Sequence, residues 1–206
     1  MKAALMLAVN PAAEREELDF YATDPYAITK AIPVFREIGL CQNVWECACG
    51  EGHLSKELSK YGYCVKSTDI ADRGFGEVQD FLATDCEWDG DILTNPPFKY
   101  AADFVEHAME VIEEGHLAAF FLKVQFLETT KRAQMFKRCG LKYVIVNSER
   151  VCCAKNGEFD TYFKKAENGA YRGGTQLYCW FVFQKGFCGE PTIKLIYKEK
   201  DGDNDG

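Results

Sequence analysis

The residues best suited to do chemistry in this chain are Asn95, Pro96, Pro97 and Phe98, which follow one another directly. The two prolines have no backbone N–H, so the main chain here offers carbonyl oxygens, and the Asn95 side chain adds an amide oxygen. The Phe98 ring follows these acceptors and suits a planar ring with an exocyclic NH₂ group, such as adenine or cytosine. Two acceptors that hold such an amine help to free its lone pair for attack on an electrophile. Taken alone, these residues also suit an ordinary turn after a strand.

Acidic residues end or follow three other strand-like runs, at Glu46, Asp69 and Asp80. The carboxyl ends of parallel strands meet at one edge of a sheet, where α/β folds bind ligands. We therefore expect these acids to share one pocket with Asn95. The spacing from Glu46 to Asp69, about 20 residues, is typical of an acid that binds a ribose diol.

A glycine turn with Gly50 and Gly52 separates the first strand from a helix expected over 53–61. Such a turn lets the main chain approach a ligand closely and points a helix N-terminus at it. The turn lacks the glycine spacing of dinucleotide folds and the lysine of phosphate-binding loops, so phosphates are not the obvious ligand. A carboxylate at Glu46 suits a cation or a ligand amine instead.

The hydrophobic pattern alternates between strand-like and helix-like segments, which predicts an α/β fold with a doubly wound, mostly parallel sheet. The expected strands are 43–47, 63–68, 78–81, 92–94, 116–124, 141–147, 176–183 and 192–197. The expected helices are 26–38, 53–61, 101–114 and 130–139. With 206 residues, one domain is expected.

The net charge of −8 argues against a protein coated in basic surface, so contact with nucleic acid must come from local patches. Two stretches qualify. A long polar loop over 150–174 mixes aromatic and basic residues, as a loop that contacts nucleic acid does. The stretch 131–142 holds five basic residues and no acid, which equally suits a solvated helix face.

The ten cysteines include no Cys-x-x-Cys pair, and several lie in apolar runs, so reduced, buried thiols are expected. The three histidines show no ligand spacing, and no metal is expected. No apolar run reaches the length of a membrane helix, which predicts a cytoplasmic protein without a membrane partner. The sequence does not indicate an oligomeric state.

Taken together, these residues make the chain resemble a class I S-adenosylmethionine-dependent methyltransferase, most closely the small phage-type DNA N6-adenine methyltransferases with an Asn-Pro-Pro-Phe motif. The resemblance runs from about Phe20 to Tyr197. It implies a Rossmann-like sheet of seven strands with an antiparallel C-terminal hairpin. The implied domain covers 20–198, between an N-terminal arm over 1–19 and an acidic, disordered tail over 199–206.

The resemblance also implies roles for individual residues. It makes Asn95, Pro96, Pro97 and Phe98 the catalytic residues that grip the target base. S-adenosyl-L-methionine is the implied cofactor, held by Tyr21, Thr23, Pro25, Glu46, Cys47, Ala48, Gly50, Gly52, Asp69, Ile70, Asp80, Phe81 and Asn95. The substrate is expected to contact Phe98, Lys99, Phe159, Tyr162, Phe163, Lys164, Lys165 and Arg172.

The expected reaction is methyl transfer to the exocyclic amine of a flipped base, most closely adenine N6 in DNA. Similar motifs serve enzymes that methylate RNA adenine, cytosine N4 in DNA or the amide of protein glutamine. A non-catalytic module that binds the cofactor and docks nucleic acid is a further alternative. The chain is too short for a large separate recognition domain, which leaves the target sequence open.

Overall fold

The computed structural model describes residues 21–155, 157–167 and 171–197. The expected arm over 1–19 and the expected tail over 199–206 lie outside these residues.

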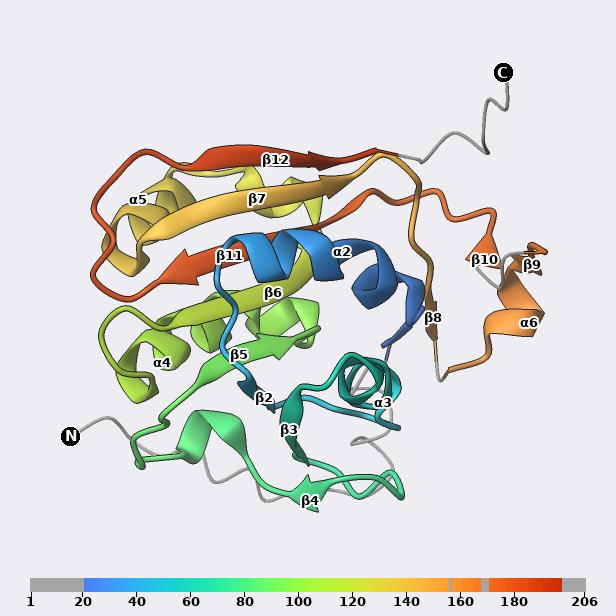
Figure 1. Cartoon of the computed structure of the whole chain (residues 1–206), viewed down its shortest axis with the longest axis horizontal. Coiled ribbons are helices and arrows are strands. Elements are labelled where there is room, and N and C mark those ends of the chain that lie inside the picture. Colours follow the sequence, from blue (N-terminus) through green and yellow to red (C-terminus); the bar gives the residue numbers. More distant parts are fainter. Residues whose placement is uncertain (1–20, 156, 168–170, 198–206) are drawn as a thin grey trace, which may run out of the picture.

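One large sheet forms the centre of the molecule (Figure 1). Its strands are β2 (Asn43–Glu46), β3 (Cys64–Asp69), β4 (Glu77–Val78), β5 (Asp91–Thr94), β6 (Leu117–Lys123), β7 (Leu141–Asn147), β11 (Tyr178–Gln184) and β12 (Thr192–Ile196). Their order across the sheet is β12-β7-β11-β6-β5-β2-β3-β4. Every neighbouring pair is parallel except the two that involve β11, which is antiparallel to both β6 and β7. The α/β fold with a mostly parallel sheet is therefore confirmed.

One detail of the expected sheet is wrong, since it has eight strands instead of seven. The antiparallel pairing expected near the C-terminal end is found between β7 and β11. Strand β11 uses both of its edges to bind β6 and β7, so β12 cannot pair with it. The additional strand β12 pairs in parallel with β7 at the outer edge of the sheet.

Helices cover both faces of the sheet. One face carries α2 (Tyr26–Glu37) and α3 (His53–Lys60), and the other carries α4 (Ala101–Val111) and α5 (Thr130–Cys139). Because both faces are covered, the inner strands are buried throughout, and all residues of β6 from Leu117 to Leu122 are buried. No helix of the described residues is both long and apolar enough to cross a membrane.

Three short 3₁₀ helices follow strands at the carboxyl edge: η1 (Phe81–Ala83), η2 (Phe98–Tyr100) and η3 (Val124–Leu127). The strand expected over 78–81 is confirmed only at Val78. Asp80 ends no strand. Its carboxylate accepts a hydrogen bond from the backbone N–H of Leu82 at 3.0 Å and caps η1.

The segment 150–174 is not a plain loop as expected. It contains β8 (Cys153–Lys155), α6 (Phe159–Tyr162), β9 (Lys164–Lys165) and β10 (Tyr171–Arg172). β8 pairs antiparallel with β1 (Tyr21–Thr23), and the segment lies beyond the carboxyl ends of β7 and β12 (Figure 1). A small core holds it together, in which the Phe159 ring stacks on the Tyr171 ring with centroids 4.8 Å apart.

Candidate active site

A cleft opens at the carboxyl edge of the sheet, where Glu46 ends β2, Asp69 ends β3 and Asn95 directly follows β5. Its volume with the open mouth is about 620 Å³. Glu46, Asp69 and Asn95 line this cleft, whereas Asp80, which was expected to share it, does not belong to the lining.

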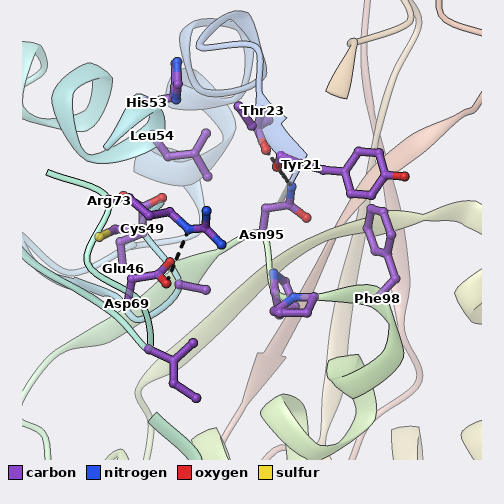
Figure 2. Close-up of a pocket in the computed structure, with 15 residues that line it drawn as sticks. Tyr21, Thr23, Glu46, Cys49, His53, Leu54, Asp69, Arg73, Asn95 and Phe98 are labelled. Atoms are coloured by element: carbon purple, nitrogen blue, oxygen red, sulfur yellow. Dashed lines mark hydrogen bonds and ion pairs between the residues drawn. The ribbon is translucent and has the colours of Figure 1, made fainter. Parts of the chain in front are cut away.

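Asn95 is held with its amide in one orientation (Figure 2). Its nitrogen Nδ2 donates to the backbone oxygen of Tyr21 at 3.1 Å and to the hydroxyl oxygen of Thr23 at 2.8 Å. A carbonyl oxygen can only accept, so the amide nitrogen must face Tyr21 and the amide oxygen must face the other way. That oxygen is buried, finds no hydrogen-bond partner among the described residues, and points to the side where the Tyr21 and Phe98 rings lie. A residue of the cleft lining therefore holds a neutral acceptor that has no hydrogen-bond partner among the described residues.

Aromatic rings surround the wall next to this acceptor. The Phe98 ring lies 5.9 Å from the Tyr21 ring and 5.9 Å from the Tyr178 ring, centroid to centroid. The Lys123 ammonium lies 4.9 Å from the centre of the Phe98 ring, within the range of a cation–π contact. This wall combines flat apolar surface with a positive charge.

Asp69 lies on the other side of the cleft, next to the glycine turn. Its carboxylate accepts hydrogen bonds from the backbone N–H groups of Gly50 at 2.8 Å and Ala71 at 3.0 Å. The Arg73 Nε atom lies 3.8 Å from the same carboxylate (Figure 2). The acid is thus fixed at the cleft wall by the turns on both sides of it.

Glu46 is almost fully buried, with 2 % of its surface exposed. Burial raises its pKa to about 8, and the nearby Asp69 carboxylate acts in the same direction. The Ser55 hydroxyl donates a hydrogen bond to Glu46 and lowers the pKa only in part. Below about pH 8 the cleft therefore holds a protonated acid at this position.

Ten residues of the expected cofactor and catalytic sets line the cleft. They are Tyr21, Thr23, Glu46, Ala48, Asp69, Ile70, Asn95, Pro96, Pro97 and Phe98.

Other residues from the expected cofactor set lie outside the cleft lining. Cys47 and Phe81 are each 2 % exposed and belong to the core, where the Phe81 ring packs against Trp45 at 5.3 Å. The Phe81 side chain is thus not free to stack on a ligand. Pro25 forms the N-terminal boundary of α2, and Asp80 caps η1.

Gly50 and Gly52 shape the turn from beside the cleft, with φ angles of 54° and 78°. Contact between the main chain of these two glycines and the cofactor stays a prediction.

The expected substrate residues beyond Phe98 do not line the cleft. Phe159 is 6 % exposed and serves the small core of the segment 150–174. The Arg172 guanidinium forms an ion pair with Glu149 at 3.1 Å. Tyr162 is 54 % exposed. The remaining members of the set are Lys99, Phe163, Lys164 and Lys165, and substrate contact by any of them stays a prediction.

Several cleft residues were not expected from the sequence. Ala22, Cys49, His53, Leu54 and Arg73 complete the lining. Arg73 follows Asp69 by four residues and its Nε atom lies near the Asp69 carboxylate. A basic residue so close in sequence to an acid at a strand end is a signal that could have predicted Arg73 as part of the site. Lys123 and Tyr178 meet Phe98 because they are opposite each other in the β6–β11 pair.

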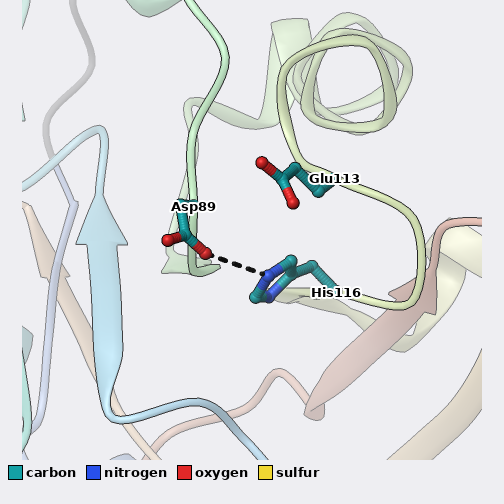
Figure 3. Close-up of side chains that lie close together, drawn as sticks. All are labelled: Asp89, Glu113 and His116. Atoms are coloured by element: carbon teal, nitrogen blue, oxygen red, sulfur yellow. Dashed lines mark ion pairs between the residues drawn. The ribbon is translucent and has the colours of Figure 1, made fainter.

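A separate group of charged side chains lies at the opposite edge of the sheet, formed by Asp89, Glu113 and His116 (Figure 3). The His116 Nε2 atom lies 3.6 Å from the Asp89 carboxylate, and its Nδ1 atom lies 2.8 Å from the buried Asp91 carboxylate. The Asp89 side chain is 90 % exposed. The group is an ion-pair cluster remote from the cleft, and the expectation that the protein uses no metal stays a prediction.

Comparisons with known proteins find similarity in structure only. No family model matches the chain, and no curated protein sequence does. TehB from Haemophilus influenzae superposes with a TM-score of 0.51 at 15 % identity, over 76 % of this chain and 62 % of that chain. A provisionally assigned RNA methyltransferase from Pyrococcus horikoshii gives 0.56 at 12 % identity, over 82 % and 87 %.

A provisionally assigned class I S-adenosylmethionine-dependent methyltransferase from Listeria monocytogenes gives a TM-score of 0.53 at 15 % identity, over 83 % of this chain and 63 % of that chain. The chain thus spans less than two thirds of the length of TehB and of the Listeria protein. At such identities the likeness concerns the fold. The described part of this chain has the fold of class I S-adenosylmethionine-dependent methyltransferases.

Proposed function

We propose that this protein transfers a methyl group from S-adenosylmethionine to the exocyclic amine of a nucleobase, with adenine N6 in DNA as the substrate. The observation that carries the proposal is the Asn95 amide. Its nitrogen is anchored by two acceptors, and its buried oxygen has no partner among the described residues. A buried acceptor without a partner is costly, so it favours a ligand that brings an N–H group.

The chemistry of the cleft wall that carries Glu46 and Asp69 fits the cofactor. Asp69 is held at the end of β3, where an acid can accept hydrogen bonds from ribose hydroxyls. Glu46 lies in the same cleft and offers a carboxyl group to an amine once it loses its proton. S-adenosylmethionine, when bound, supplies an electrophilic methyl group on a sulfonium.

The opposite wall of the cleft, which carries Asn95, Pro96 and Phe98, fits the base. The Phe98 ring provides a stacking surface for a planar base, and the Pro96 carbonyl oxygen and the Asn95 amide oxygen can accept the two N–H bonds of its amine. Holding the amine in this way positions its lone pair for transfer. The amine becomes strongly acidic only after methylation, so its proton can pass to water, and no protein base is required.

The experiment is a transfer assay with labelled S-adenosylmethionine and unmethylated DNA, RNA and protein, followed by digestion to nucleosides and amino acids. The expected product is N6-methyladenine from DNA. Label in RNA adenine, cytosine N4 or glutamine assigns one of the alternative substrates instead. Cofactor binding without any transfer indicates a non-catalytic module.

The variant Asn95→Ala tests the catalytic assignment in the same assay. We expect the transfer rate to fall about a hundredfold or more, as it does when one aligned polar group of this kind is removed. Asn43→Ala is the matched control, because Asn43 begins β2 at the opposite edge of the sheet. Equal rates for Asn95→Ala and the wild type would mean that Asn95 does not hold the amine.

A further inference from the structure

We infer that Thr23 is a positioning residue for the reaction, which acts by fixing the orientation of the Asn95 amide. The inference rests on the proposed function, because it assigns a task to Asn95. It separates Thr23 from the residues that hold the cofactor, although its side chain reaches the same cleft.

The contacts of the amide carry the inference. The two hydrogens of Nδ2 have two acceptors, the Tyr21 carbonyl at 3.1 Å and the Thr23 hydroxyl at 2.8 Å. The first belongs to the main chain, but the second is a side chain that is 3 % exposed. With both acceptors in place, the amide nitrogen faces Tyr21 and Thr23, so the amide oxygen, which is the side-chain acceptor of Asn95, faces the other way.

The position of the Thr23 hydroxyl is fixed from behind by the segment 150–174. Thr23 lies opposite Cys153 in the antiparallel pair of β1 and β8. The next residue, Asp24, donates its backbone N–H to the Cys152 carbonyl at 3.0 Å. Its carboxylate accepts the backbone N–H of Tyr171 at 2.9 Å. Hydrogen bonds from the segment 150–174 therefore hold strand β1 on the side away from Asn95.

The segment 150–174 is also connected to the Phe98 ring, which is the expected stacking surface for the base. Cys153, which lies opposite Thr23 in the β1–β8 pair, belongs to the same hydrophobic cluster as Tyr178. The Tyr178 ring in turn lies 5.9 Å from the Phe98 ring. The acceptor and the stacking surface for the base are thus both connected to the segment 150–174, which gives this segment a structural task at the active site.

Thr23→Val tests the inference, because valine keeps the shape of threonine and removes the hydroxyl. At saturating cofactor, we expect the single-turnover transfer rate to fall about tenfold to a hundredfold, as the loss of one buried hydrogen bond predicts. Cofactor affinity should stay within about twofold of the wild type. Thr23→Ser restores the hydroxyl and should recover most of the rate. Thr192→Val, on the exposed edge strand β12, is the matched control.

The opposite result overturns the inference: if Thr23→Val weakens cofactor binding but leaves the transfer rate at saturating cofactor unchanged, Thr23 is a cofactor contact. Equal rates for Thr23→Val and the wild type also overturn it. If the wild type transfers no methyl group to DNA, RNA or protein, the proposed function is wrong instead. The hydrogen bond itself is then read from the ¹⁵N resonance of the Asn95 side chain, assigned with Asn95→Ala. An unchanged resonance in Thr23→Val excludes positioning by Thr23.

Discussion

The environment of Glu46 gives the cleft an acid that is neutral near physiological pH. The side chain is 2 % exposed, and burial raises its pKa to about 8 from an ordinary value of 4.5. The Ser55 hydroxyl and the neighbouring Asp69 set this balance from opposite directions. An ammonium group next to Glu46 favours the charged form, so cofactor binding at pH 7 should release a proton from this residue.

The raised pKa predicts how stability depends on pH. Between about pH 4.5 and about pH 8 the folded protein holds a proton that the unfolded chain has lost, so the free energy of unfolding falls as pH rises. The contribution of Glu46 is up to about 1.4 kcal/mol per pH unit. Glu46→Gln should flatten the profile by about that slope, as measured by denaturant unfolding at several pH values. Glu77→Gln, on the exposed strand β4, is the control; parallel profiles for Glu46→Gln and the wild type would contradict the prediction.

At the scale of elements, the turn between β2 and α3 depends on the shape of one glycine. Gly52 has a φ angle of 78°, and a Cβ atom there would lie 2.3 Å from the Phe75 ring. This turn also carries the Gly50 N–H that holds Asp69. A side chain at Gly52 must therefore displace the ring or the turn, and the turn fixes a residue of the cleft.

Gly52→Ala is expected to lower the free energy of unfolding by about 3 kcal/mol, from the cost of a positive φ together with overpacking. Gly39→Ala separates the two effects. Gly39 has a φ angle of 80°, but a Cβ atom there meets nothing within 4 Å, so only the backbone cost of about 1 kcal/mol should remain. Equal losses in denaturant unfolding would show that the contact with Phe75 does not matter. Cofactor affinity should fall for Gly52→Ala alone.

Some of these elements can be predicted from the sequence and others cannot. The periodic segments of α5 and β7 appear at their expected bounds, since long apolar patterns identify elements without further context. The place of β12 depends on which strand edge stays free, and local pattern holds no information on this. The short strands in 150–174 were missed because polar residues surround the buried stretch from Val151 to Ala154. At the site, Asn95 and Phe98 follow from residue type, whereas Lys123 and Tyr178 reach Phe98 only through strand pairing.

At the scale of the whole molecule, a net charge of −8 opposes binding to nucleic acid unless basic residues are placed near the cleft. Helix α5 has two basic pairs at opposite ends. Lys131 and Arg132 lie in its first turn, which follows β6 and η3 at the carboxyl edge of the sheet. Lys137 and Arg138 lie in its last turn, near the start of β7 at the opposite edge. Only the first pair lies at the edge that carries the cleft.

This asymmetry gives a test that compares two double variants with the same change in net charge. If the first turn contacts phosphates, Lys131→Gln with Arg132→Gln should weaken DNA binding and reduce the slope of log affinity against log salt by about 2, since each phosphate contact contributes about 0.9. Lys137→Gln with Arg138→Gln should leave the slope unchanged, because these residues are too far from the edge that binds the base. Equal effects of both variants in a fluorescence anisotropy titration would indicate that overall charge governs binding. No effect of either variant would assign the phosphate contacts to another surface, with the basic strand β9 as the next to be changed.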